Sequence, residues 1–225
     1  MRGRGERALR AIATSSTLMQ ASRLNTHPYM ASKGLAHVRV PVVSMRVIRE
    51  NMIAPKVMRE IPNNEEIALF SLRYSTYQLA SVQMISADGT KCFMPGGRIS
   101  GAYHRIGLGH TEILCEGIAT GYALAEAAKD MDVSIFCCMS ANGIKQASAT
   151  VGHVVAADND KSRTGVKAAN AAGLPYAKPP IVGEDFNDLW QSEPGAVKRA
   201  VSALMGAAQS RAGHRIEGYL SRESP

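Results

Sequence analysis

The chain has 225 residues, of which 45% are hydrophobic and 20% charged, and its formal net charge at neutral pH is +7. These values are typical of a soluble globular protein with one main domain and an extension. No apolar run approaches the roughly 18 residues that a membrane span needs. No apolar block with a small-residue cleavage site follows the N-terminus, so we expect a soluble, intracellular protein without a membrane partner.

The positive charge is concentrated in the first quarter of the chain. Residues 1–60 contain eleven Lys or Arg against three Asp or Glu, whereas residues 61–225 contain fifteen against sixteen. Basic segments of this kind typically bind phosphates and release counterions. Two alternatives stay open: a solvated basic helix with no partner, and an organelle transit peptide in the Arg-rich, nearly acid-free first 20 residues.

The four cysteines show no CxxC pair and no nearby CxxH, so zinc spacing is absent and we expect no zinc. They are Cys92, Cys115, Cys137 and Cys138. The last three lie in apolar, strand-like runs, where a free cysteine behaves as a small hydrophobe and packs in the core.

The first half of the chain predicts a helix and then an antiparallel meander. Residues 6–22 predict a helix with Leu9, Ile12 and Met19 on its apolar face. Residues 35–60 have no firm period. From about residue 66 to 107 apolar residues alternate with polar ones, and an Asp-Gly turn between two such runs indicates a hairpin. The later Gly-Gly-Arg sequence is more typical of a plain turn than of a phosphate site.

The second half alternates strands and helices from residue 111 to 181, which is typical of βαβ units with a parallel sheet. An acidic turn, GEDFNDLW, follows the last strand, and a final helix is predicted at about residues 194–211.

Acidic residues follow three of these predicted strands. Glu116 follows the first strand, and Asp158 and Asp160 follow the third. Asp185 and Asp188 come after the last. Because ligands gather at the carboxyl ends of parallel strands, and crowded carboxylates repel unless a cation intervenes, this pattern predicts a Mg²⁺ site. Taken singly, Glu116 is better interpreted as a helix cap. The two aspartates of the third strand are, taken singly, equally consistent with an Asn-containing turn.

Residues 111–190 resemble a Toprim domain, the catalytic module of bacterial-type primases, topoisomerases and certain nucleases. The resemblance lies in EGIATG, AADND and EDFNDLW, in that order and spacing. The segments QMISADGTKCFMPGGRISGAYHRIG and HPYMASKGL resemble primase-like proteins of phages and mobile plasmids, and they extend the resemblance to about residues 25–190.

The resemblance implies an α/β fold with a Toprim, Rossmann-like parallel sheet flanked by helices, preceded by a small β meander and a basic helical arm. It suggests four regions, which are a basic helical region 1–62, a meander subdomain 63–110, a Toprim catalytic domain 111–190, and a C-terminal helix and tail 191–225.

The function that the resemblance implies is Mg²⁺- or Mn²⁺-dependent synthesis of RNA primers from ribonucleoside triphosphates on single-stranded DNA, in a bacterial or phage-infected cytoplasm. A replicative helicase or another replication protein is the expected partner. Glu116 would act as general acid or base or lie beside the metals, which Asp158, Asp160, Asp185 and Asp188 would hold. The expected contacts to template or nucleotide phosphates are Lys91, Arg98, His104, Arg105, Asn142 and Lys145.

Primases of this type commonly carry an N-terminal zinc-binding module, and many phage forms also carry a helicase. Neither is present in these 225 residues. A Toprim nuclease and a non-catalytic DNA- or protein-binding adaptor are therefore the alternatives.

Overall fold

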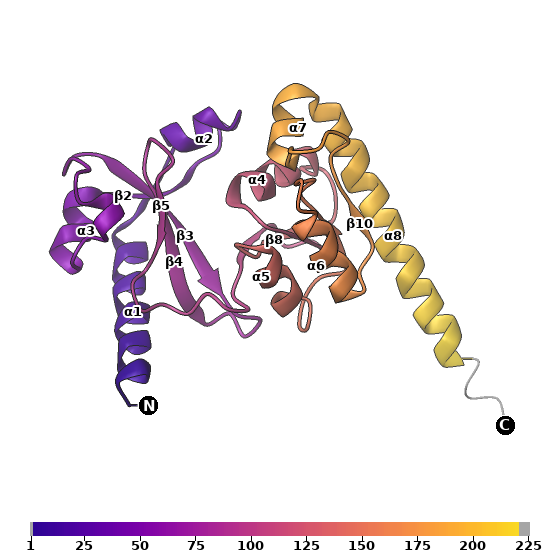
Figure 1. Cartoon of the computed structure of the whole chain (residues 1–225), viewed down its shortest axis with the longest axis horizontal. Coiled ribbons are helices and arrows are strands. Elements are labelled where there is room, and N and C mark those ends of the chain that lie inside the picture. Colours follow the sequence, from indigo (N-terminus) through magenta and orange to yellow (C-terminus); the bar gives the residue numbers. More distant parts are fainter. Residues whose placement is uncertain (1, 221–225) are drawn as a thin grey trace. The chain divides into compact units, whose positions relative to one another are not determined.

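The computed structural model describes the backbone of residues 2–220 and the side chains of residues 5–210. The chain forms two compact units, residues 1–104 and residues 105–225 (Figure 1). None of the helices in the described part is long and apolar enough to cross a membrane.

The first unit is built on a five-stranded sheet in which all neighbouring strands are antiparallel. The strand order is β1-β2-β3-β4-β5. The elements are α1 (Arg2–Ala21), β1 (Arg23–Asn25), α2 (Pro28–Ser32), β2 (Val40–Ser44), α3 (Met45–Asn51), a 3-10 turn η1 (Lys56–Met58), β3 (Glu66–Arg73), β4 (Leu79–Ile85) and β5 (Lys91–Phe93). The predicted hairpin joins β4 to β5, and Gly89 takes the positive φ of 86° that its turn requires.

Helix α1 confirms the predicted helix, and two of its three predicted apolar residues, Ile12 and Met19, are half-buried, with Met19 packed against the core. Its buried residues are Ala8, Ala11, Ser15 and Leu18, whereas Leu9 is 70% exposed. The helix packs against β4 and α3. Small alanines allow this close packing, so the larger Leu9 lies on the outer side of the helix.

The core of the first unit is filled mainly by branched and methionine side chains. Ile67 and Leu69 of β3 pack with Met84 of β4, and Met45 and Ile48 of α3 join them. One expectation for this region was wrong: the last strand of the predicted meander, β6 (His104–Ile106), belongs to the second sheet.

The second unit holds a five-stranded sheet of order β10-β9-β7-β8-β6. Three pairs of neighbouring strands are parallel, namely β10 with β9, β9 with β7, and β7 with β8. The elements after β6 are β7 (Thr111–Cys115), α4 (Ile118–Ala127), β8 (Val133–Cys137), α5 (Ala141–Ala147), β9 (Val154–Ala156), α6 (Thr164–Ala172), β10 (Tyr176–Ala177), α7 (Phe186–Ser192) and α8 (Pro194–Leu220).

The strand order creates a switch point between β7 and β9. From β7 the chain crosses through α4 to β8 on one side, and from β9 it crosses through α6 to β10 on the other. Since such crossovers are right-handed, α4 lies on one face of the sheet and α5 and α6 on the opposite face. Helices α7 and α8 pack with α4, and α5 packs with α6. In open α/β sheets, ligands bind at the carboxyl edge of such a switch point.

The cysteines of the second unit lie in its core, as predicted. Cys115 and Cys137 face each other on β7 and β8 with their sulfur atoms 3.8 Å apart, and both are fully buried. Cys138 is also buried, whereas Cys92 of the first unit is half-buried. All four thiols are free.

Candidate functional site

Glu116 lies at the carboxyl end of β7, at the switch point. One of its carboxylate oxygens, Oε1, is buried without a hydrogen-bond partner. The carboxylate does not cap α4, which follows it in the chain; it accepts a hydrogen bond from the backbone of Ala141 at the start of α5. Burial and the negative charge of Asp160 nevertheless raise the pKa of Glu116 above its usual range.

Asp158 lies across the switch point, two residues beyond the end of β9. Its Oδ1 atom is also buried without a partner. Burial raises the pKa of Asp158 to about 7, and repulsion from neighbouring carboxylates adds to the effect. Those carboxylates belong to Glu116, Asp185, Asp160 and Asp188. The structure thus brings the predicted acids of three strand ends into one electrostatic cluster.

Gly165, in the first turn of α6, packs closely against these two acids. A Cβ atom at this position would lie 3.1 Å from Oε1 of Glu116 and 3.0 Å from the backbone nitrogen of Asp158. Contacts this short are tighter than side-chain carbon atoms normally make. A side chain at position 165 would therefore press on the orphaned oxygen of Glu116 and on the Asp158 backbone.

Asp160 takes part in the turn that leads into α6. Its Oδ1 accepts hydrogen bonds from the Thr164 backbone at 2.9 Å and the Ser162 hydroxyl at 3.0 Å. Burial raises the pKa of Asp160, but these hydrogen bonds outweigh it and hold the pKa below its usual range. Asp160 therefore stays ionised and also holds the shape of the loop.

Asp185 and Asp188 form a capping box at the start of α7. Oδ1 of Asp185 accepts the backbone N–H groups of Asn187 and Asp188, and Oδ2 of Asp188 accepts the N–H of Asp185. Their local role is thus structural, although both lie near enough to Asp158 to raise its pKa.

Sequence reasoning missed Glu184, which directly precedes this capping box. Its Oε2 is the third carboxylate oxygen buried without a partner in the described part of the chain, beside those of Glu116 and Asp158. The backbone carbonyl of Glu184 accepts the N–H of Asn159, which ties Glu184 to the residue between the two aspartates. The available signal was its place in the acidic turn GEDFND.

The donor types and charges of this cluster fit a hard divalent cation. Mg²⁺ prefers carboxylate oxygens, and Oε1 of Glu116 and Oδ1 of Asp158 are buried acceptors that such an ion would satisfy. In the part of the chain that the structure describes, no three His, Cys, Asp or Glu side chains are grouped closely enough to hold one ion. The side chains would therefore have to converge on it.

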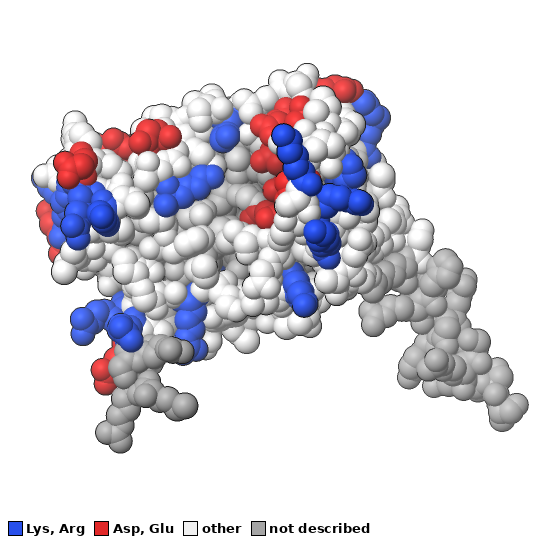
Figure 2. Space-filling model, viewed as in Figure 1, with Lys and Arg blue, Asp and Glu red and all other residues white. Residues whose placement is uncertain are grey.

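Basic and polar residues of the second unit surround the acids. Figure 2 shows a red acidic patch in the right half of the view, with Lys and Arg side chains beside it. Asn142 and Lys145 are exposed on α5. Lys161 and Arg163, which sequence reasoning did not single out, are exposed in the loop after Asp160. Their signal was the sequence DNDKSR, which places cations directly after the acidic pair.

The other predicted contact residues have more varied surroundings. Lys91 of the first unit is exposed and lies 5.1 Å from the centre of the Tyr29 ring. Arg98 is also exposed, in the same unit. His104 bonds the Ser71 carbonyl at 3.1 Å, and loss of solvation lowers its pKa to about 4, so it is neutral at pH 7.

Arg105, in the second unit, is engaged within the fold. Its guanidinium donates to the Ser134 hydroxyl at 2.9 Å and stacks 5.4 Å from the centre of the Phe136 ring. A structural role for Arg105 therefore competes with the predicted phosphate contact.

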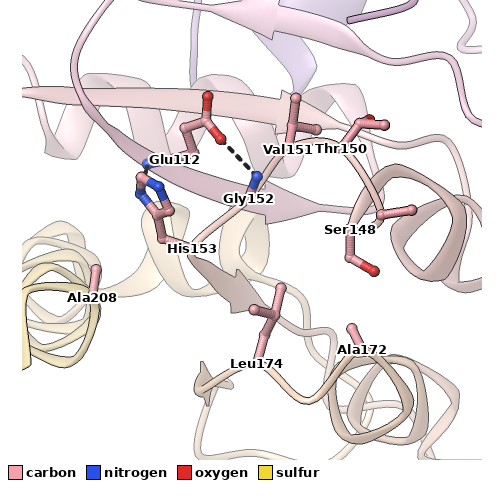
Figure 3. A pocket seen from close by; sticks show the side chains of 10 residues that line it. Glu112, Ser148, Thr150, Val151, Gly152, His153, Ala172, Leu174 and Ala208 are labelled. Carbon is pink, nitrogen blue, oxygen red and sulfur yellow. Dashed lines mark hydrogen bonds between the residues drawn. The ribbon is translucent and has the colours of Figure 1, made fainter. Parts of the chain in front are cut away.

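The opposite edge of the same sheet carries a pocket of about 480 Å³ (Figure 3). Glu112, at the start of β7, closes it on one side. The Glu112 carboxylate accepts the N–H of Gly152 at 2.7 Å, and its backbone N–H donates to Nδ1 of His153 at 3.1 Å. The His153 N–H in turn donates to the Glu112 carbonyl at 2.8 Å. These bonds fasten the loop before β9.

Comparison with known proteins finds a similarity within the second unit. Residues 111–196 match the model of the Toprim domain. The comparison with curated protein sequences found no match.

Three solved primase structures resemble the chain. The DnaG primase catalytic domain bound to single-stranded DNA shares 15% identity and a TM-score of 0.51, over 92% of this chain and 83% of that one. The RNA polymerase domain of Mycobacterium tuberculosis DnaG, in complex with double-stranded DNA, shares 13% identity and a TM-score of 0.48, over 90% and 81%.

The primase fragment of the bacteriophage T7 primase-helicase protein shares 13% identity and a TM-score of 0.44, over 60% of this chain. The chain spans 62% of that fragment. At these sequence identities the similarity concerns the fold alone. The argument for the fold rests on the first of the three structures, because its TM-score exceeds 0.5.

Proposed function

We propose that the chain is a Mg²⁺- or Mn²⁺-dependent, primase-type nucleotidyltransferase, because residues 111–196 match the model of the Toprim domain. It joins ribonucleoside triphosphates into short RNA primers on single-stranded DNA. The observation that carries this proposal is the pair of buried carboxylate oxygens without partners, on Glu116 and Asp158, at the switch point of the sheet. Buried acceptors of this kind need a ligand to satisfy them.

Divalent ions bound here would neutralise charge on the triphosphate and lower the pKa of the attacking hydroxyl. Asp158 and Asp160 are the residues that would hold them. Glu116 accepts the proton of the attacking 3′-hydroxyl. Asp185 and Asp188 add negative charge near Asp158 while their capping box keeps the start of α7 in place.

Basic residues and one asparagine supply the proposed contacts to phosphates. In the second unit these are Asn142 and Lys145 on α5, the helix whose first residue bonds Glu116. In the first unit they are Lys91 and Arg98. Residues 1–60 of this unit carry an excess of Lys and Arg, and this positive charge favours binding of single-stranded DNA. His104 and Arg105 are weaker candidates, because the first is neutral and the second is engaged with Ser134.

The test is incubation of the full chain with single-stranded DNA, labelled ribonucleotides and Mg²⁺, with products scored for both extension and template cleavage. Asp158→Ala should abolish synthesis and leave the fold intact, because the residue fills no apolar core. Glu112→Gln is the matched control, since it changes a carboxylate of the same sheet at the opposite edge. The wild type and this control should both make oligoribonucleotides.

Other products would contradict the proposal in distinct ways. Shortened template without new RNA would mean a Toprim nuclease. DNA binding without either product would mean an adaptor. Primer synthesis that persisted in Asp158→Ala at limiting Mg²⁺ would show that the metal assignment is wrong.

A further inference from the structure

The pairing between β9 and β10 stops abruptly beside the acidic cluster. Its last backbone bond is donated by the N–H of Ala157 to the carbonyl of Ala177 at 2.9 Å. Two residues further along lie Pro179 and Pro180, which have no N–H groups and cannot continue a β ladder. The segment that leads from β10 to Glu184 therefore needs another means of attachment.

Asn159 provides that attachment, because it bonds both ends of the segment 179–184. Its side-chain Nδ2 donates to the carbonyl of Pro179 at 2.9 Å and more weakly to that of Pro180 at 3.5 Å. Its backbone N–H donates to the Glu184 carbonyl at 3.0 Å, and its carbonyl accepts the Gly183 N–H at 2.7 Å.

The burial pattern agrees with this anchoring role. Asn159 is only 4% exposed, whereas Ile181 and Val182 at the tip of the segment are 60% and 59% exposed. Buried amides are normally satisfied by hydrogen bonds, and here the partners are carbonyl oxygens that proline residues leave available. The segment is thus held at its base while its tip faces solvent.

The anchored segment leads directly into acidic residues. It ends at Glu184, whose Oε2 is buried without a partner, and continues into the Asp185–Asp188 capping box. Asn159 itself lies between Asp158 and Asp160. One residue therefore connects the acids that follow β9 with the acids that follow β10.

We propose that Asn159 is a positioning residue that sets the spacing between the Asp158/Asp160 pair and the carboxylates from Glu184 onward. The inference rests on the proposed function, in which these acids surround divalent ions. The Asn159 side chain touches neither substrate nor ion; it acts by holding the segment 179–184. Changes to residues that orient metal ligands typically weaken metal affinity by about 10- to 100-fold.

The test uses Asn159→Ala, with Asn170→Ala, an exposed asparagine on α6, as the matched control. In metal-free protein, amide hydrogen exchange at Gly183 and Glu184 should speed up in Asn159→Ala, while β7 and β8 stay protected. Mn²⁺ binding, followed by paramagnetic resonance, should weaken by about 10- to 100-fold. Asn170→Ala should match the wild type in both measurements. If Asn159→Ala does not fold, Asn159→Ser, which keeps one donor, should show an intermediate loss.

The outcomes separate this inference from the proposed function. Wild-type protein that bound no Mn²⁺ would overturn the proposed function. Wild-type binding together with equal binding by Asn159→Ala would overturn the positioning role alone. Unchanged exchange at Gly183 and Glu184 would also overturn it, because the side chain would then not hold the segment.

Discussion

A glutamate lies near each end of β7, and the two carboxylates differ in their hydrogen bonding. Glu112, at the amino end, has its carboxylate bonded to the Gly152 N–H, and its backbone is bonded to His153 on both sides. Glu116, four residues later, has a buried oxygen without any partner. Glutamate therefore holds the loop before β9 at the amino end of the strand, and it presents an unsatisfied acceptor at the carboxyl end.

This difference separates an acid that is hydrogen-bonded within the fold from an acid that we propose to be functional. A bonded carboxylate stabilises the fold, whereas a buried one without partners destabilises it until a ligand arrives. Burial near like charges is a frequent property of functional sites. Variants that change one edge of the sheet at a time therefore test whether the two edges differ in function.

The largest effect is expected from Glu116→Gln compared with Glu112→Gln. The amide at position 116 keeps the size of the side chain but cannot accept a proton, so the rate of the chemical step should fall by about 10²- to 10⁴-fold. Glu112→Gln should leave the rate unchanged. Single-turnover primer extension measures both, and equal losses in the two variants would remove the functional distinction between the edges.

The second effect is a pH dependence of stability that comes from Asp158. The folded state raises the pKa of Asp158 from 3.8 to about 7. The stability that protonated Asp158 contributes is therefore fully present below pH 3.8 and is lost as the pH rises through 7. The loss should be on the order of 2–4 kcal/mol in metal-free protein. Asp158→Asn should remove most of this slope and leave the part that comes from the raised pKa of Glu116.

The single tryptophan, Trp190 on α7, allows this measurement on the second unit alone. Urea unfolding followed by its fluorescence, in chelator and between pH 4 and 8, gives the free energy of unfolding. A wild-type protein whose stability did not fall across this range would contradict the crowding of the acids.

The third effect is stabilisation by Mg²⁺. An ion that binds only the folded state stabilises it by about 2.7 kcal/mol at one hundred times its dissociation constant. The stabilisation should persist in Glu112→Gln and disappear in Asp158→Asn, as read from the same fluorescence transition. Loss of this stabilisation in Glu112→Gln would mean that the ion binds elsewhere.

The smallest effect is expected on stability, from the hydrogen bond between Glu112 and Gly152. Glu112→Gln keeps an acceptor for the Gly152 N–H but removes the charge that strengthens this bond, so unfolding should become easier by about 1 kcal/mol. Urea unfolding of the second unit measures it. No destabilisation at all would mean that the loop before β9 is held by His153 and its backbone bonds alone.

Local sequence patterns predicted the fold well where neighbours in sequence decide the structure. The alternation of strands and helices after residue 111 and the Asp-Gly hairpin are of this kind. The transfer of β6 to the second sheet and the burial of Ala8 instead of Leu9 depend on packing between distant segments. A periodicity argument has no access to that packing.

In the candidate site, too, local patterns identified some residues, whereas contacts between distant segments determined the others. Glu116 and Asp158 were predicted because each directly follows a strand, and the structure brings them into one electrostatic cluster. Asp185 and Asp188 have a spacing that suits a capping box as well as a metal site, and the structure shows the box. Glu184 was missed because its importance depends on its backbone bond to Asn159.

The distribution of thiols gives this protein a built-in probe of how each unit opens. Thiol reagents attack the thiolate, and hydrogen bonding with Cys137 together with burial raises the pKa of Cys115 well above its usual range. Burial likewise raises the pKa of Cys138, and it raises that of Cys92 in the first unit to about 11. Cys92, Cys115 and Cys138 therefore react chiefly when their surroundings open. Because one thiol lies in the first unit and three lie in the second, labelling followed by mass spectrometry can time the two openings separately without an added cysteine or dye.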